Sequence, residues 1–144
     1  MSHPLHPAVV HFPIATWSLA SVADIAGLWW HGPAFLFAAW LLLVGTAMAL
    51  VAAATGMVQF LQLPANDVRG DLVMRHMSLV LVAFACYATS LLLRVQDVDW
   101  QGGVAQAPGP WAIGASIVGF VFLLLGGYQG GQLVYRHSVG IERS

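Results

Sequence analysis

The sequence predicts an all-α integral membrane protein, an antiparallel bundle of four transmembrane helices in one domain. Hydrophobic residues make up 59% of the 144 residues, and only 8% are charged. A soluble domain carries about 25% charged residues, so this composition would not keep an ordinary surface hydrated. Hydrocarbon cannot pair with free backbone groups, and no apolar run alternates with a period of two, so the runs are expected to be helices.

Four apolar runs are each long enough for the roughly 20 residues that a helix needs to cross the hydrocarbon core. Short segments join them, which favours up-and-down packing of neighbouring helices. The runs cover residues 7–30, 33–63, 72–93 and 111–135.

The first run begins at Pro7, which suits the first helical position because its missing N–H would have no partner there. Pro13 lies inside the run and removes one backbone hydrogen bond, so we expect a kink just after His11. The segment MSHPLHP in front of it lacks the positive charge of a signal peptide. We therefore expect this run to remain as a membrane span.

Four of the six histidines are expected at one end of the bundle, where spans one and three begin and spans two and four end. His11 and His76 each lie about four residues into a span, so at 1.5 Å per residue both sit roughly 6 Å inside the same leaflet. His6 precedes span one, and His137 follows span four. These side chains could be interfacial or interhelical hydrogen-bonding groups, but ionisable groups inside a membrane are candidates for function.

Small residues on spans two and four leave room opposite the two histidines within the spans, His11 and His76. Close helix packing is their usual role, yet they also make space for a flat ligand. They are Ala49, Ala52, Ala53 and Gly56 on span two, and Gly126, Gly127, Gly130 and Gly131 on span four.

Asp24 is expected to have a structural role. It lies about 20 Å deeper than His11 along the first helix. The long side chain of Arg94, at the end of span three, can reach inward from the opposite interface. We therefore expect an ion pair between Asp24 and Arg94.

Haem b is the ligand that explains most of the histidine-rich end. The imidazoles of His11 and His76 would fill both axial positions of the iron. Arg69, Arg75 or Arg136 at the rim would meet the propionates. The chain has a single cysteine and no C-x-x-C-H motif, so the haem would be bound non-covalently.

These features predict electron transfer, with quinol or a partner redox protein as the exchange partner. We find no nucleophile–base pair and no acidic cluster, which leaves open whether the protein has substrate chemistry of its own, and nothing indicates nucleic acid binding. The alternative is a zinc or copper site or a divalent-metal transporter, since imidazole suits both metals. Its ligands would come from His3, His6, His11, His76 and His137. A purely structural subunit, one or two haems, and a monomer or a homodimer also remain open.

The arginines predict the orientation of the bundle. Arg69, Arg75, Arg136 and Arg143 lie on the side of the histidine end, and only Arg94 lies toward the other side. By the positive-inside rule, both termini are expected in the cytoplasm.

Two stretches of the sequence resemble a known family. HPLHPAVVHFPIATWSLASVAD at 3–24 and GGQLVYRHSVGI at 130–141, with the isolated His76, resemble the bacterial membrane proteins of the domain of unknown function 2231 family. The resemblance covers essentially the whole chain and implies a multi-pass protein of the bacterial inner (cytoplasmic) membrane. Family members joined to Rieske-type or c-type cytochrome modules agree with electron transfer. The signature positions would be His6, His11, His76, Gly130, Gly131, Tyr135 and His137, and we add Tyr135, Gly127 and Gly131 to the expected cofactor-binding residues.

Overall fold

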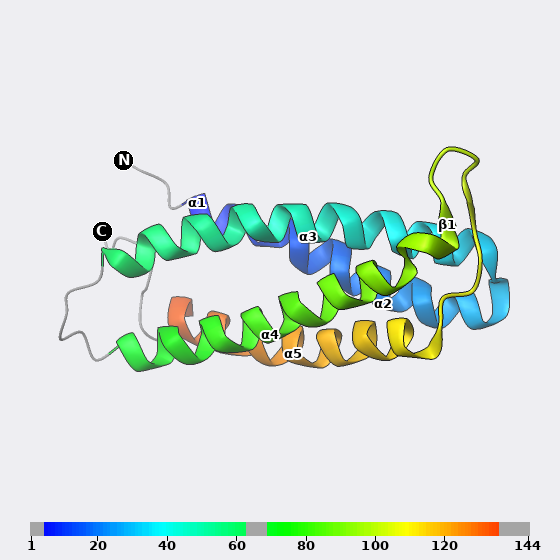
Figure 1. Cartoon of the computed structure of the whole chain (residues 1–144). Helices are drawn as coiled ribbons and strands as arrows, with labels where there is room; N and C mark the ends of the chain where they lie inside the picture. The colour runs from blue at the N-terminus through cyan, green and yellow to red at the C-terminus, as the bar shows by residue number, and fades with distance from the viewer. Residues whose placement is uncertain (1–4, 63–68, 136–144) are drawn as a thin grey trace.

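A computed structural model of the protein describes residues 5–62 and 69–135. The described chain is mostly helical and confirms the predicted antiparallel four-helix bundle (Figure 1). Its elements are α1 (Leu5–Val9), α2 (His11–Trp30), α3 (Gly32–Leu61), α4 (Gly70–Arg94), the 3-10 turn η1 (Val95–Asp97), β1 (Val98–Asp99), β2 (Val104–Ala105) and α5 (Pro110–Tyr135).

The bundle consists of two helical hairpins. α2 packs along α3, and α4 packs along α5; the hairpins then meet through α3 against α4 and α2 against α5. The start of α1, the end of α3, the start of α4 and the end of α5 lie at one end of the bundle, and the small antiparallel ribbon of β1 and β2 lies at the other (Figure 1). The two hairpins move apart toward the first end.

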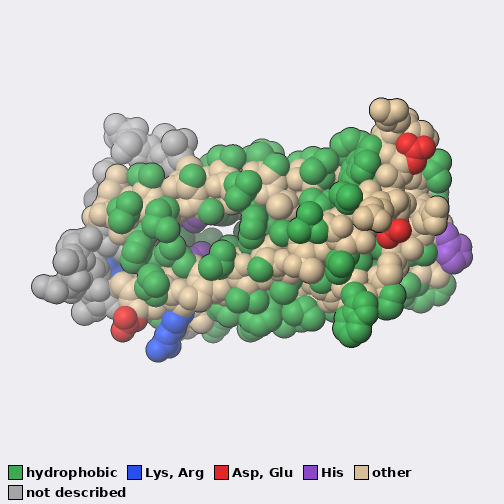
Figure 2. Space-filling model, in the orientation of Figure 1, with side chains coloured by type: hydrophobic (Ala, Val, Ile, Leu, Met, Phe, Trp, Pro, Cys, Tyr) green, Lys and Arg blue, Asp and Glu red, His purple; other side chains and the backbone are tan. Residues whose placement is uncertain are grey.

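The outer surface of the bundle is apolar, as a lipid-facing surface must be. Large side chains such as Leu19, Leu81 and Leu92 are at least half exposed, and hydrophobic atoms cover most of the visible face (Figure 2). Four helical segments are long and apolar enough to cross a membrane. They are His6–Trp30, Gly32–Leu61, Gly70–Asp97 and Pro110–Tyr135. The protein is therefore a multi-pass membrane protein.

The first span is interrupted at Val10, between α1 and α2. Pro13 has no N–H to donate to the carbonyl of Val9, one turn earlier, and its ring crowds that carbonyl. Hydrogen bonds from Val10 N to His6 O and from Ile14 N to Val10 O still carry the chain across the interruption. The sequence predicts a kink just after His11, whereas the interruption lies just before it.

An ion pair between Asp24 of α2 and Arg94 of α4 lies in the bundle core, as predicted. Arg94 donates from Nη1 and Nη2 to the two carboxylate oxygens, at 2.7 and 3.0 Å, and both side chains are at most 1% exposed. Arg94 also donates to the hydroxyl and the carbonyl of Ser90. The Ser90 hydroxyl in turn donates to the carbonyl of Ala112, at 2.7 Å. The pair therefore ties α2, α4 and α5 together.

Removing one member of this pair should destabilise the bundle strongly. Asp24→Asn or Arg94→Gln would leave the other charge buried without a counter-ion, which typically costs about 3–5 kcal/mol. We expect this loss in the free energy of unfolding, measured on protein in detergent micelles. Asp71→Asn, at an exposed acid in the first turn of α4, is the matched control and should cost less than about 1 kcal/mol. Equal losses in the core and control variants would contradict a stabilising role for the pair.

Candidate functional site

His6 is held against α3 by the short helix α1. Its Nδ1 lies 2.9 Å from the carbonyl oxygen of Ala52 and 3.2 Å from the hydroxyl of Thr55. The ring lies over Gly56, where an added Cβ would come within 2.9 Å of the ring carbon Cε1. A side chain at position 56 would therefore push the imidazole away.

His76 is held against α5 in the same way. Its Nδ1 lies 2.9 Å from the carbonyl oxygen of Gly126. The ring lies over Gly130, where an added Cβ would come within 3.0 Å of Cε1. Gly130 faces His76 as predicted, whereas Gly56 faces His6 and not the exposed His11.

These hydrogen bonds assign the tautomer of each ring. A carbonyl oxygen can only accept, so Nδ1 of His6 and of His76 carries the proton and donates it. The lone pair of the neutral imidazole is then on Nε2. Among the described residues, no hydrogen bond engages Nε2 of either ring. Each histidine is therefore oriented by the protein and keeps one nitrogen available to a ligand, an arrangement typical of metal-binding histidines.

The two rings belong to one region of the bundle. His6, on the first span, lies near His76 on α4. Figure 2 shows histidine side chains inside a hollow between α3 and α4, near the end where the hairpins move apart. Both rings are partly buried. The structure thus brings together one histidine from each hairpin.

Gln129 adds an unsatisfied polar group to the same turn of α5. Its side-chain oxygen Oε1 is buried and has no hydrogen-bond partner among the residues that the structure describes. The residue precedes Gly130 and follows Gly126, the two glycines that contact His76. Buried polar groups nearly always have a partner, so this oxygen is an unsatisfied acceptor on the turn of α5 that carries Gly126 and Gly130.

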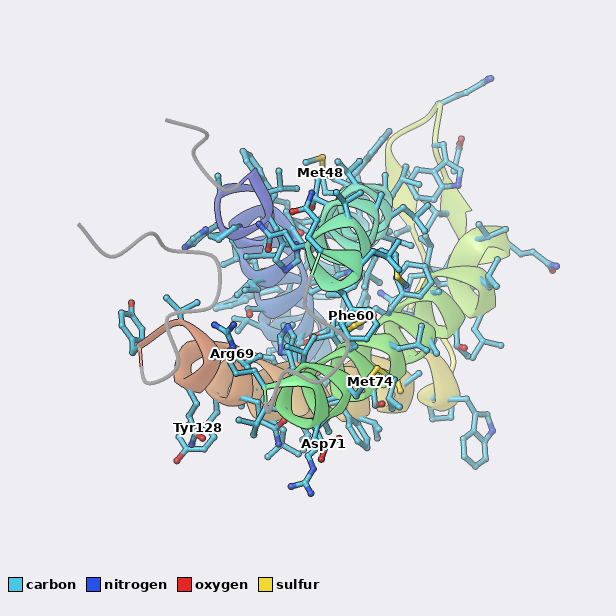
Figure 3. The ribbon with its side chains drawn as sticks, turned by 90° about the vertical axis from the view of Figure 1, so that its left-hand side faces the viewer. Met48, Phe60, Arg69, Asp71, Met74 and Tyr128 are labelled. Carbon is cyan, nitrogen blue, oxygen red and sulfur yellow. The ribbon has the colours of Figure 1, made fainter. Side chains whose placement is uncertain are left out.

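The other predicted site residues occupy different places. His11 and Arg75 have exposed side chains. In the end-on view, Arg69 reaches across the end of the bundle, whereas Asp71 and Met74 lie on its outer side (Figure 3). Arg136 and His137, like His3, lie outside the described residues.

Gly127, Gly131 and Tyr135 lie on the outer side of α5, away from His76. An added Cβ at Gly127 would meet no atom within 4 Å, and one at Gly131 would meet only the Tyr135 ring. The three residues line a shallow open cavity of about 310 Å³ together with Tyr128 and Gln132, and Tyr128 points outward in Figure 3. The glycines that face the histidine are the neighbouring pair, one residue earlier.

Residues 5–62 and 69–135 contain no cluster of three or more His, Cys, Asp or Glu side chains that could hold a metal ion. Structural and catalytic zinc sites use three or four protein ligands. The described part of the chain therefore offers a pair of imidazoles and no larger ligand set.

The fold and this region define a class of protein: a four-span membrane bundle with a pair of oriented histidines between its hairpins at one end. Within that class, the chain belongs to the family described as predicted membrane proteins with domain of unknown function 2231, whose model matches residues 2–143. No curated protein and no solved structure shows a significant match to it.

The contact between Gly130 and His76 generates a test of the site. Gly130→Val should displace the ring and weaken its hydrogen bond to Gly126, because overpacking a close contact typically costs about 1–3 kcal/mol. Gly127→Val is the matched control, since it carries the same intrinsic helix cost on a face with open space. Unfolding in detergent should show a lower midpoint for Gly130→Val than for Gly127→Val. Identical midpoints would mean that the ring does not depend on the glycine.

Proposed function

We propose that this protein is a membrane-embedded b-type haem protein for electron transfer, with the haem held non-covalently between His6 and His76. The observation that carries the proposal is the matched pair of imidazoles. Each is fixed through Nδ1 by a backbone carbonyl of the partner helix, and each keeps Nε2 available. The sequence alone favours His11 as the partner of His76, but the exposed side chain of His11 moves the proposal to His6.

The residues present fit a haem better than a zinc or copper ion. A porphyrin supplies four ligands of its own, so two imidazoles complete the coordination of its iron. A bare divalent ion would need one or two more protein ligands, and none cluster with the pair among the described residues. Gly56 and Gly130 keep the rings flat against the helices, and the hollow between α3 and α4 offers an apolar surrounding (Figure 2).

The rim of the site carries positive charge that suits haem propionates. Arg69 extends across the end of the bundle (Figure 3), and Arg75 follows on the exposed side of α4. Guanidinium groups bind carboxylates with paired, charge-assisted hydrogen bonds. Arg69 is therefore the described residue that we assign to the propionates, Arg136 joins it by its position in the sequence, and the exposed side chain of Arg75 is not assigned to them.

A haem with two protein imidazoles supplies one-electron transfer. With His6 and His76 as its two protein ligands, a bound haem would have no site left for a substrate at the iron, which favours an electron carrier over an enzyme. The hollow opens on the lipid-facing side of the bundle, between α3 and α4 (Figure 2). A lipid-soluble quinol can reach this side directly, so we assign quinol as the electron donor ahead of a partner redox protein.

Absorption spectroscopy tests the cofactor. The purified protein should carry haem and, after reduction, show the sharp alpha band of a low-spin six-coordinate b-type centre. His6→Ala and His76→Ala should lose the haem or leave it five-coordinate. His11→Ala is the matched control, because its side chain is exposed on the same span, and it should keep the wild-type spectrum.

Two outcomes would contradict the proposal. Protein from haem-replete cells that is colourless and holds stoichiometric zinc or copper would support the alternative metal-binding or transport function. A spectrum that changes in His11→Ala and stays unchanged in His6→Ala would return the axial role to His11.

The arginine distribution supports a cytoplasmic position for this end of the bundle. Arg94, the one arginine toward the opposite side, is buried in the ion pair with Asp24 and does not act as a loop charge. The loops at the other end of the bundle then contribute no positive charge, whereas the histidine end carries four arginines. Positive charge near span ends favours the cytoplasm. We propose the bacterial inner membrane, with both termini cytoplasmic.

Cysteine labelling of intact cells tests this orientation. Single cysteines at Ser2, Asn66 and Gln101, in a Cys86→Ala background, report on the two membrane faces. A membrane-impermeant maleimide should react at position 101 and leave positions 2 and 66 unlabelled until the cells are permeabilised. The reverse pattern would place the histidine end in the periplasm.

A further inference from the structure

Three pairs of side chains lie near each other across the centre of the bundle, and the members of each pair are 70 residues apart in the sequence. His6 lies near His76 at one end. Trp17 stacks on Tyr87 deeper in the bundle, with ring centroids 4.7 Å apart and planes 15° apart. Asp24 binds Arg94 toward the other end. The first member always lies on the α1–α2 span and the second on α4, always at the same spacing.

The second helices of the two hairpins follow the same rule with a constant spacing of 74 residues. Gly45 on α3 lies against Trp17, and Gly119 on α5 lies against Tyr87. Gly56 lies against His6, and Gly130 lies against His76. The carbonyls that accept from the two imidazoles belong to Ala52 and Gly126, which are also 74 residues apart.

The buried positions repeat with these spacings. On α2 and α4, buried residues coincide in four pairs: Pro13 and Ala83, Trp17 and Tyr87, Ala20 and Ser90, Asp24 and Arg94. On α3 and α5 they coincide in five: Ala38 and Ala112, Leu42 and Ser116, Gly45 and Gly119, Ala49 and Leu123, Ala52 and Gly126. The two hairpins therefore use the same faces at the same depths.

Such contacts locate a symmetry axis. In a two-fold arrangement, a residue on the axis contacts its own equivalent in the other unit, and every off-axis contact occurs twice. Two self-equivalent contacts, Trp17 with Tyr87 and Asp24 with Arg94, and the nearby rings of His6 and His76 lie at three depths, which places the axis along the bundle. The contacts of α3 with α4 and of α2 with α5 are the duplicated off-axis pair.

We infer that the chain is a tandem repeat of one helical hairpin, and that His6 and His76 are equivalent halves of a single two-fold-symmetric binding site on the axis. Such a site takes a ligand that accepts two equivalent imidazole nitrogens, as a metalloporphyrin does. The identity of this ligand as haem rests on the proposed function, whereas the equivalence of the two halves does not.

The ion pair explains why the two repeats differ where they meet. Two identical hairpins would bring either two carboxylates or two guanidinium groups together on the axis, and like charges buried in contact are strongly unfavourable. With an aspartate in one repeat and an arginine in the other, the two side chains at this position attract each other. Ser90 accepts a hydrogen bond from Arg94, and its equivalent in the first repeat is Ala20. The serine is therefore present only in the repeat that has the arginine.

Exchange of the ion pair tests the symmetry without reference to any ligand. Asp24→Arg and Arg94→Asp alone each place like charges together and should abolish folding or greatly lower the unfolding temperature. The double variant should regain most of the lost unfolding temperature. Adding Ala20→Ser to it should raise the unfolding temperature further, because the new serine is the equivalent of Ser90. Ser18→Thr, at a partly buried position off the axis on α2, is the control and should give no such gain. A combined variant no more stable than the single variants would overturn the inference.

Cavity variants test the equivalence of the two halves of the site. His6→Gly and His76→Gly, loaded with haem b, should both become five-coordinate and should both return to six-coordinate with added imidazole. Equivalent halves should give imidazole affinities within roughly twofold of each other. A bound haem that depends on only one of the two histidines would overturn the symmetric site. A wild-type protein that binds no haem would instead refute the proposed function, and the exchange experiment would then decide the symmetry.

Discussion

Polar side chains in this bundle find their partners inside the protein, because the surrounding hydrocarbon offers none. The Asp24–Arg94 pair is the strongest case, since two buried charges satisfy each other and draw Ser90 and the carbonyl of Ala112 into the same network. Ser21 repeats the principle one turn earlier on α2, where it bonds to the hydroxyl of Tyr87 and to the carbonyl of Ser116. These contacts run between the two hairpins, so the same constraint that pairs the polar groups also joins the halves of the bundle.

The histidines obey this constraint only in part, and that exception is what distinguishes the site. Each ring satisfies Nδ1 with a backbone carbonyl and keeps Nε2 available. Gln129, on the same turn of α5, leaves a buried oxygen unpaired within the described residues. The polar atoms without a partner lie at the end where the hairpins move apart, whereas the polar groups around Asp24 and Arg94 are paired. The bundle therefore combines a tightly paired end that holds the hairpins together with an open end that can receive a ligand.

The tandem arrangement gives this division a physical reason. A two-fold axis brings equivalent residues face to face, so two histidines on the axis make a ready pair of opposed ligands. The same axis would place like charges together wherever an ionisable residue repeats. One chain with two hairpins allows the repeats to diverge at that point into aspartate and arginine while the histidines stay alike. Few residues are identical between the repeats, so the symmetry lies in the positions that are buried and scarcely in the amino acids themselves.

The sequence by itself determined the membrane class, the four-helix bundle, the gathering of histidines at one end and the Asp24–Arg94 pair, because hydropathy and charge act over whole spans. Only the tertiary structure decided which histidine joins His76. The structure shows that His6 shares the face of the first span that buries Pro13 and Trp17, whereas His11, five residues after His6, points away from that face and is exposed. It also decided between neighbouring glycines: successive residues point about 100° apart around a helix, so Gly130 faces the histidine while Gly131 faces outward. The proposed haem site depends on these directions and not on depth alone.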